Sequence, residues 1–395
     1  MHIPITKPYI ADREYELIKE SLDSGWLVQG PKVEEFESRV ADFTGAGYSV
    51  AVNSCTSGQF IMSRILDLQP GDEVILPAFT WISTANAIEF PGATPVFCDV
   101  SLDTFNIDPA LIRDHLTTHT KAIFPVALFG LAPDMHEINH IAANHGLRVV
   151  EDCACGLGTR IGETHCGMYG DAGVLSFHPR KTITTGEGGM IITNDKSIDN
   201  MARSLRDHGA DISDYERHEG KKSYHMSSYS LLGYNMRMTD LQGAMGIAQM
   251  EKLEEILEIK TRLAAEFNDR LSHIRWLKLP REPEGYQHSY QTYCTLYKPQ
   301  ETLDALEKND ANKLDELHEE RNTLMEKLEE KGIMTRPGTH SIHLQKLYQE
   351  KYGYHKMDFP RAYAADRLSL ALPFYASMTD EEKDYLFRHL EELGP

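Results

Sequence analysis

Between about residues 45 and 195, short apolar runs alternate with amphipathic stretches, and this alternation constrains the fold more than any other feature. The runs are mostly rich in β-branched residues and lie at 73–77, 94–98, 121–126, 147–151 and 173–177. Continuous apolar runs of this length are typical of strands that are covered on both faces. Helical patterns separate them, at 83–89, 109–116 and 136–145. The alternation therefore predicts an α/β domain with a mainly parallel sheet and right-handed crossovers.

The rest of the chain predicts a second, smaller domain. A long helical pattern covers 239–271, and its apolar stripe consists of Met245, Ala248, Leu253, Ile256 and Leu257. The chain has 395 residues, a length that suits two or three domains of roughly 150 residues. We therefore predict a large α/β domain over 10–250 and a smaller C-terminal domain over 251–395, joined by the long helix.

The balance of charges argues against some classes of partner. Forty Lys and Arg residues stand against sixty Asp and Glu residues, which gives a net charge of −20. Such a surface repels phosphate backbones and anionic lipids, so we expect no nucleic-acid or membrane partner. Residues 1–10 lack the basic start and apolar core of a signal peptide. The six cysteines are irregularly spaced and suit a reducing compartment, so we expect a cytoplasmic protein.

Three cysteines and a histidine in one short segment raise the alternative of a metal site. They are Cys153, Cys155, Cys166 and His165. A C-x-C pair beside a single histidine lacks the paired C-x-x-C spacing of zinc sites. We therefore predict that this segment holds no metal.

Residues that could take part in binding or catalysis follow three of the predicted strands. In an open α/β sheet, ligands bind beyond the carboxyl ends of the strands. Asp152 directly follows the strand at 147–151, and Lys181 lies in a loop after the strand at 173–177. A Ser/Thr/Gly turn at 54–58 leads into a helix, whose free N–H groups and positive dipole end suit a phosphate. Taken singly, each has an ordinary alternative: a buried ion pair, a surface lysine and a helix cap.

Together these residues match what pyridoxal phosphate requires of a protein. A desolvated Lys181 could act as the nucleophilic amine that forms a Schiff base. Asp152 would keep the pyridine nitrogen protonated, so that the ring withdraws electrons. Trp81, after the strand at 73–77, is in a suitable place to stack on the ring. The sequence therefore predicts a pyridoxal-phosphate enzyme with Lys181 and Asp152 as its catalytic residues.

Six longer segments resemble one known family over nearly the whole chain. They are SGWLVQG at 24–30, GDEVILPAFTWISTANAI at 71–88, VVEDCACGLG at 149–158, SFHPRKTITTGEGGMI at 176–191, LGYNMRMTDLQGAMGIAQ at 232–249 and GIMTRPGTHSIH at 332–343. On these segments the chain resembles the DegT/DnrJ/StrS family of sugar aminotransferases. The resemblance implies the fold type I architecture. It comprises a mainly parallel seven-stranded sheet in the large domain and a smaller α+β C-terminal domain.

The resemblance also implies a role for each matching residue. Lys181 corresponds to the Schiff-base lysine, Asp152 to the acid on the pyridine nitrogen, and Trp81 to the stacking aromatic. Asn235 corresponds to a residue that reaches the cofactor phosphate of the neighbouring subunit, which implies a homodimer with shared active sites. The implied phosphate contacts within the subunit are the backbone around Cys55, Thr56, Ser57 and Ser176.

Two departures from the family pattern concern the lining of the cofactor site. Cys155 stands where many members have a glutamine that contacts the ring hydroxyl, and a thiol is a poor hydrogen-bond donor. Ala127 and Phe129 stand where many members have a histidine and a tyrosine. We therefore expect the polar lining on this side of the site to differ from that of other members.

The activity implied is transfer of an amino group from L-glutamate to a keto sugar, with pyridoxamine phosphate as the intermediate form. The implied acceptor is a nucleotide-linked 4-keto-6-deoxy sugar of surface polysaccharide or glycoconjugate biosynthesis. Lys181 would shuttle the proton between the donor and the cofactor, and the kinetics would be ping-pong. Candidate acceptor contacts are His178, Arg180, Glu187, His288, Arg336, His340 and His343. For each histidine a structural role is an equally good interpretation, and Glu187 could equally stabilise its turn.

Other functions remain open as alternatives. A small phosphorylated ketone as acceptor would need the same cationic pocket. Dehydratases of this family use the same cofactor but carry a histidine in place of the lysine, so Lys181 argues against that reaction. A noncatalytic regulatory protein of the same fold would not need Lys181, Asp152 and Trp81 together. A metal hydrolase would have to be built on Cys153, Cys155 and His165.

Overall fold

The computed structural model describes residues 1–212 and 226–395, and a seven-stranded sheet lies at its centre. The strands are β1 (Tyr48–Val52), β2 (Glu73–Pro77), β4 (Thr94–Cys98), β5 (Thr120–Ile123), β6 (Arg148–Cys153), β9 (Ala172–Ser176) and β10 (Gly189–Thr193). Their order across the sheet is β1-β10-β9-β6-β5-β2-β4. Neighbours from β9 to β4 are parallel, and β10 is antiparallel to both β9 and β1. The predicted mainly parallel sheet is confirmed.

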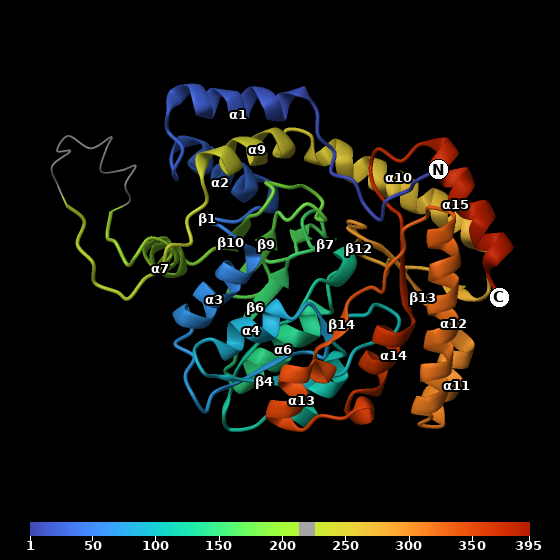
Figure 1. Ribbon diagram of the computed structural model, residues 1–395. Helices are drawn as coiled ribbons and strands as arrows, with labels where there is room; N and C mark the ends of the chain where they lie inside the picture. The colour runs from blue at the N-terminus through green and yellow to red at the C-terminus, as the bar shows by residue number, and fades with distance from the viewer. Residues whose placement is uncertain (213–225) are drawn as a thin grey trace.

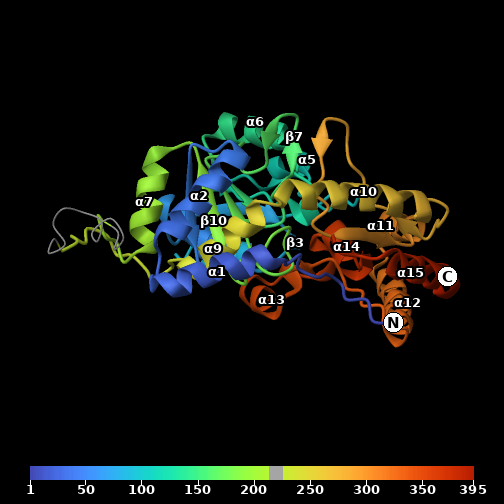
Figure 2. The same ribbon diagram turned by 90° about the horizontal axis from the view of Figure 1, so that it is seen from above.

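Helices cover both faces of this sheet (Figures 1 and 2). The helices of this part of the chain are α1 (Asp12–Ser24), which packs on α9, and α2 (Pro31–Thr44), α3 (Cys55–Ile65), α4 (Ser83–Glu89), α5 (Pro109–Ile112), α6 (Met135–His145), α7 (Lys196–Arg206) and α9 (Asp240–Met250). Successive strand residues point to opposite faces, and they join two hydrophobic clusters. Val50 and Val74 pack in the cluster that includes α3, α4 and α7. Ala51 and Ile75 pack in the other, with α2, α6 and α9.

A second, smaller sheet lies beside the first, on the right of Figure 1. It consists of β11 (Leu277–Lys278), β13 (Tyr293–Tyr297) and β15 (Ser369–Leu372), all antiparallel. The helices around it are α10 (Leu253–Leu271), α11 (Pro299–Glu307), α12 (Ala311–Glu330), α14 (Pro360–Leu368) and α15 (Asp380–Leu393). The chain start belongs with this part, because Ile3 pairs with Ile333. The two chain ends consequently lie near each other (Figure 1).

Shorter elements connect the two parts. The strands are β3 (Phe79–Thr80), β7 (Arg160–Ile161), β8 (Thr164–His165), β12 (Tyr286–Gln287) and β14 (His340–Ser341). The helix is α13 (Lys346–Tyr352), and the 3₁₀ turns are η1 (Arg113–His115), η2 (Leu128–Gly130), η3 (Ile342–Leu344) and η4 (Lys356–Asp358). Strand β14 pairs with β3, and β12 pairs with β7. These two contacts bring segments from late in the chain to the edge of the large sheet.

The long helix predicted at 239–271 is wrong in one respect, because it is divided into α9 and α10. Lys252 has φ −120° and ψ 12°, outside the helical region. Helix α9 packs against α1 and α2, whereas α10 buries Leu263, Phe267 and Leu271 in the core that extends to the second sheet. One straight helix could not face both cores, so the chain turns between them. Across 1–212 and 226–395, no helix is long and apolar enough to cross a membrane.

Candidate active site

Asp152 lies at the carboxyl end of β6, where two donors hold its side chain. The carboxyl is 4% exposed. The hydroxyl of Thr84 donates to Oδ2 at 2.6 Å, and the backbone N–H of Ala154 donates to Oδ1 at 3.0 Å. Thr84 belongs to α4, so the carboxyl at the end of β6 is fixed by a helix that packs on the sheet. Because buried carboxylates with fixed donors keep one orientation, Asp152 is suited to hold a cationic ring nitrogen.

Lys181 follows β9, and its amine points to the same edge of the sheet. Its Nζ donates to Sγ of Cys155 at 3.1 Å. Burial lowers the pKa of Lys181, but Cys155, Cys55 and the carboxyl of Asp152 together outweigh burial and leave the pKa above its ordinary value. The structure thus brings Lys181, Cys155, Cys55 and Asp152 into one electrostatic neighbourhood.

Three glutamines hold the loop that carries Lys181. The side chain of Gln291 donates to the carbonyl of Arg180 at 2.5 Å. From α9, Gln249 accepts from the backbone N–H of Thr184 at 3.2 Å, and Gln242 donates to the carbonyl of Glu187 at 2.6 Å. The loop is therefore anchored on both sides of the lysine.

The start of α3 closes the site beside this loop. Ser54 caps the helix by accepting from the N–H of Ser57 at 3.1 Å, and the Ser57 hydroxyl donates to Asn53 at 2.7 Å. A Cβ on Gly189 would lie 2.5 Å from the backbone of Ser54, so only glycine lets β10 approach the helix start this closely. The helix end offers backbone donors and a positive dipole, which suits a phosphate.

The residues predicted to contact the phosphate lie at the start of α3 and at the end of β9. Cys55 and Thr56 open α3, and Ser176 is the last residue of β9. Burial raises the pKa of the Cys55 thiol well above its ordinary value, so this residue offers its backbone and not a thiolate. An amine, a fixed buried carboxyl and a helix start with hydroxyls are the donor set that pyridoxal phosphate needs, so the residues present fit this cofactor.

Trp81 and His340 form a pair of exposed rings. Trp81 lies between β3 and α4 and is 57% exposed, which is unusual for so large an apolar side chain. Its ring lies 5.8 Å from that of His340, because β14 pairs His340 with Thr80. An open aromatic face of this kind suits a flat ligand.

Four further candidate residues gather around Lys181. Burial lowers the pKa of His178, with Glu187 acting in the opposite direction. Partial burial and the charge of Arg336 lower the pKa of Arg180. The backbone of Arg336 pairs with Ala371 of β15, and because its charge acts on Arg180, the two guanidinium groups lie near each other. Two cations that repel each other favour an anionic ligand between them.

Two candidate substrate contacts, His288 and His343, are buried in the structure. His288 is 3% exposed and stacks on Tyr290 at 4.0 Å, and burial lowers its pKa to about 3. His343 is fully buried against Phe359 and Tyr354, and burial lowers its pKa to about 4. Both side chains are occupied in packing and present no surface to a substrate. The structural interpretation left open for the histidines is the one that applies here.

Asn235 is exposed, whereas Ala127 and Phe129, which depart from the family pattern, are buried. Asn235 is exposed, and its backbone pairs with Asp207. Ala127 is buried, and its N–H donates to the carbonyl of Asp152 at 2.9 Å. Phe129 has φ +59° and packs against Phe79 and Phe105, so this position serves the core. The polar lining expected to be missing on this side is replaced by apolar packing and by the Cys155 thiol.

The cysteine segment does not assemble the ligand set considered for a metal. Within the described residues, the candidate group is Glu151 with Cys153 and Cys166, all buried. Glu151 accepts hydrogen bonds from three backbone N–H groups, at Gly167, Tyr169 and Gly170. Its carboxyl is therefore already satisfied by the backbone, while Cys155 points elsewhere, to Lys181.

Three residues that form hydrogen bonds to Asp152 or to the loop of Lys181 were not identified from the sequence. Thr84, Gln249 and Gln291 each contact the site through one hydrogen bond to a residue far away in the chain. Thr84 lies within the WISTANAI segment, which was the available signal, but its contact with Asp152 depends on the packing of α4 against the sheet. No spacing in the sequence indicates the contacts of Gln291.

Known proteins resemble this chain over its whole length. A model of the DegT/DnrJ/EryC1/StrS aminotransferase family matches residues 8–391. The spore coat polysaccharide biosynthesis protein SpsC of Bacillus subtilis is 34% identical over 391 residues, which cover 99% of this chain and 97% of that protein.

Solved structures of this family also resemble the chain over its whole length. The putative sugar aminotransferase Spr1654 of Streptococcus pneumoniae in its PMP form has a TM-score of 0.88 and 26% identity, with 100% of this chain and 98% of that chain covered. The GDP-4-keto-6-deoxy-D-mannose-3-dehydratase of E. coli has a TM-score of 0.85 and 26% identity, with 99% of each chain covered. The chain therefore belongs to the DegT/DnrJ/EryC1/StrS aminotransferase family, whose members use pyridoxal phosphate, and the enzyme class and cofactor predicted from the sequence are confirmed.

Proposed function

We propose that this enzyme transfers an amino group from L-glutamate to a nucleotide-linked keto sugar, most specifically a 4-keto-6-deoxy sugar. The observation that carries the proposal is the contact of the Lys181 amine with Cys155 beside the fixed carboxyl of Asp152. A lysine at this position can leave and return in each half-reaction. The name of the Bacillus relative, which refers to polysaccharide biosynthesis, supports a sugar as the acceptor.

Each half-reaction can be derived from the residues of the site. When bound, the cofactor supplies a ring that withdraws electrons from the substrate carbon. Asp152 would hold the proton on the ring nitrogen, and Thr84 fixes the carboxyl in place for this task. Lys181 would be displaced by the amino donor, and its free amine would take the proton from the donor's α-carbon and deliver it to the cofactor carbon two bonds away. The start of α3 and Ser176 would bind the phosphate.

The charges near Lys181 support an acceptor that carries phosphate. The charge of Arg336 acts on Arg180, so two guanidinium groups lie near each other. The ring of His340 is exposed, whereas the ring of Trp81 is assigned to the cofactor. A nucleotide-linked sugar has phosphates for the guanidinium groups and a flat base for the ring of His340. A small phosphorylated ketone would use the guanidinium groups but not the histidine ring, so it is the second candidate.

We also propose a homodimer with shared sites. Asn235 is exposed, and exposed apolar side chains accompany it on the same segment, at Met226, Tyr229 and Leu232. Apolar side chains exposed to this degree are typical of an interface. Asn235 would reach the cofactor phosphate in the site of the second copy, as the family resemblance implies.

The chemistry of the thiols supports a reducing compartment. All six cysteines are free, and Sγ of Cys153 lies 2.9 Å from Sγ of Cys166. Two adjacent thiols persist in the cytoplasm, where glutathione keeps them reduced. We therefore place the reaction in the cytoplasm.

The proposed function is tested by comparing acceptors with L-glutamate as the donor. We expect amination of nucleotide-linked 4-keto-6-deoxy sugars with ping-pong kinetics, and turnover of the Lys181→Ala variant at background level. Acceptance of a small phosphorylated ketone in preference to every nucleotide-linked sugar would overturn the assigned acceptor. Substantial transamination by the Lys181→Ala variant would overturn the role of the lysine.

A further inference from the structure

Lys260 on α10 is a buried lysine that the reaction described above does not use. Its side chain is 5% exposed, and its Nζ donates to the carbonyl of Gln291 at 3.2 Å and lies 5.6 Å from the ring centre of Phe374. Burial lowers its pKa to about 7, and the thiol of Cys155 acts in the opposite direction. No ion pair of the described residues includes Lys260. Because a buried lysine without a carboxylate is costly, its presence calls for a specific role.

The contact with Gln291 leads directly to the catalytic loop. Gln291 accepts from Lys260 with its backbone carbonyl and donates from its side chain to the carbonyl of Arg180 at 2.5 Å. Arg180 immediately precedes Lys181. A chain of two hydrogen bonds therefore connects α10 with the residue next to the reactive amine.

The segment formed by residues 288–292 also contacts Cys155, which accepts the hydrogen bond from Lys181. The hydroxyl of Ser289 donates to the carbonyl of Cys155 at 3.3 Å. The segment is pressed against Gly130, where a Cβ would lie 2.5 Å from the Ser289 hydroxyl and 2.8 Å from the Gln291 backbone nitrogen. Gly130 has φ +102°, so a side chain is excluded there for two reasons. Residues 288–292 are thus fixed from both sides and touch the backbone on each side of the Lys181–Cys155 contact.

A small cavity lies beside the loop that carries Lys181. Lys181 and Lys260 both line it, together with Gln249 and Tyr375. The loop of Lys181 therefore has open space on one side, and it depends on its hydrogen bonds for its position. Loss of one of these bonds would let the loop move toward the cavity.

We propose that Lys260 is a positioning residue for transamination, which holds residues 288–292 through the Gln291 carbonyl and thereby fixes Lys181 against Cys155. The proposal rests on the role of Lys181 given above. Misplacement of a reacting group by about 1 Å can cost up to about 100-fold in rate. Lys260 therefore affects the proton transfer at Lys181 more than the binding of either substrate.

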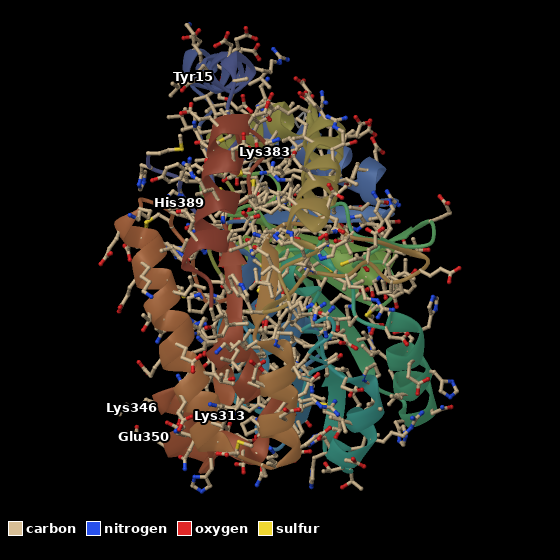
Figure 3. All side chains as sticks on the ribbon, turned by 90° about the vertical axis from the view of Figure 1, so that its right-hand side faces the viewer. Tyr15, Lys313, Lys346, Glu350, Lys383 and His389 are labelled. Atoms are coloured by element: carbon tan, nitrogen blue, oxygen red, sulfur yellow. The ribbon has the colours of Figure 1, made fainter. Side chains whose placement is uncertain are left out.

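The test uses the full chain with Lys260→Met, which keeps the length of the side chain but removes the donor. Lys383→Met is the matched control, because Lys383 is also a largely buried lysine and pairs with Glu266 of α10. It lies on α15, on the outer side of the second sheet (Figure 3). Two quantities are measured: the single-turnover rate with L-glutamate, and the rate at which iodoacetamide alkylates Cys155 in the cofactor-free protein.

We expect Lys260→Met to lower the single-turnover rate by about 10- to 100-fold with little change in KM for L-glutamate. Alkylation of Cys155 should become faster, because the segment that holds its carbonyl is released. Lys260→Arg keeps a donor and should restore most of both values, whereas Lys383→Met should leave both unchanged. Gln291→Met removes the side-chain contact with Arg180 but keeps the backbone carbonyl that accepts from Lys260, so it should lower the single-turnover rate and leave the alkylation of Cys155 unchanged.

The proposal is overturned if Lys260→Met and Gln291→Met leave both rates at the wild-type values, even when the variants are less stable. If Lys260→Met does not fold, Gln291→Met decides by its single-turnover rate, and a rate at the wild-type value overturns the proposal. A wild-type protein that does not respond to L-glutamate would contradict the proposed function alone. The alkylation rates would in that case still decide whether Lys260 positions Cys155.

Discussion

The amine of Lys181 lies 3.1 Å from the thiol of Cys155, and the carboxyl of Asp152 belongs to the same group. The three residues come from two strand ends that are adjacent in the sheet, since β6 pairs with β9 in parallel. Residues 26 or more positions apart in the chain thus meet because parallel strands end at one edge. The proposed transamination depends on this arrangement.

Replacement of Cys155 by alanine should shift the loading of the cofactor to lower pH. Cys155 helps to raise the pKa of Lys181, and only the neutral amine can bond to the cofactor aldehyde. Without the thiol, the pKa of Lys181 falls and more of the amine is neutral at a given pH. The measurement is the rate of cofactor binding to the cofactor-free protein as a function of pH. Cys294→Ala, at a buried site in β13, is the control and should leave the profile unchanged; a profile that moves to higher pH in Cys155→Ala would contradict the account.

Thr84→Val should weaken the site and the fold together. The substitution keeps the shape of the side chain but removes the donor to Asp152 at 2.6 Å. A buried charged acceptor that loses its partner costs about 1–3 kcal/mol in the free energy of unfolding. The rate of the glutamate half-reaction should fall by roughly tenfold, which corresponds to about 1.4 kcal/mol.

Thr302→Val provides the comparison for this variant. Thr302 is also buried, and its hydroxyl bonds the backbone of Lys298, far from Asp152 in the chain. Urea unfolding should show a loss of stability in both variants, and stopped-flow kinetics should show a slower half-reaction in Thr84→Val only. Equal rates in the two variants would show that the contact with Asp152 has no catalytic effect.

His343 should make the protein less stable as the pH falls. Burial lowers its pKa to about 4 in the folded state, whereas the unfolded chain has the ordinary value of 6.5. Between these values the unfolded state binds more protons, so stability is lost as the pH falls below about 6.5. The contribution from this residue is about 2 kcal/mol between pH 7 and pH 5. His343→Phe should remove this part of the decline in urea unfolding, and an identical decline in the two proteins would refute it.

Two inactive variants should restore activity to each other if the sites are shared between subunits. Lys181→Ala removes the amine from a subunit's own site, and Asn235→Ala removes the contact with the site of the partner. When equal amounts are unfolded and refolded together, half of the dimers contain one subunit of each kind, and one of their two sites is intact. About a quarter of the wild-type activity should return, as measured by transamination of L-glutamate. No recovery from a mixture that does form dimers would place Asn235 outside the partner's site.

Several strands and helices of the large domain were predictable because each corresponds to one contiguous apolar or amphipathic run in the sequence. Strands β2 and β4 lie at 73–77 and 94–98 as the apolar pattern predicted, and α4 lies at 83–89. Burial on both faces leaves a continuous apolar run that local turns delimit. The single helix over 239–271 was wrong because helical periodicity does not report a change of packing partner. The break falls at Lys252, where the chain passes from one core to the other.

The site was predictable only where a residue stands at a strand end or matches the family pattern. Lys181 and Asp152 satisfied both conditions, and the structure places them together. His288 and His343 have the same chemistry in the sequence as His340, yet only His340 is exposed beside Trp81. Burial of a single histidine depends on contacts across the fold, and no local pattern encodes it. The contact between Thr84 and Asp152 was missed for the same reason.

The most direct test of the central claim is the absorption spectrum of the protein purified with pyridoxal phosphate, before and after L-glutamate is added. We predict a visible band from the cofactor bound at Lys181, which is replaced by the band of the pyridoxamine form when L-glutamate is present. The Lys181→Ala variant should fold and should not show this conversion. A wild-type protein that shows no visible band, or a Lys181→Ala variant that converts the cofactor as wild type does, would contradict the account.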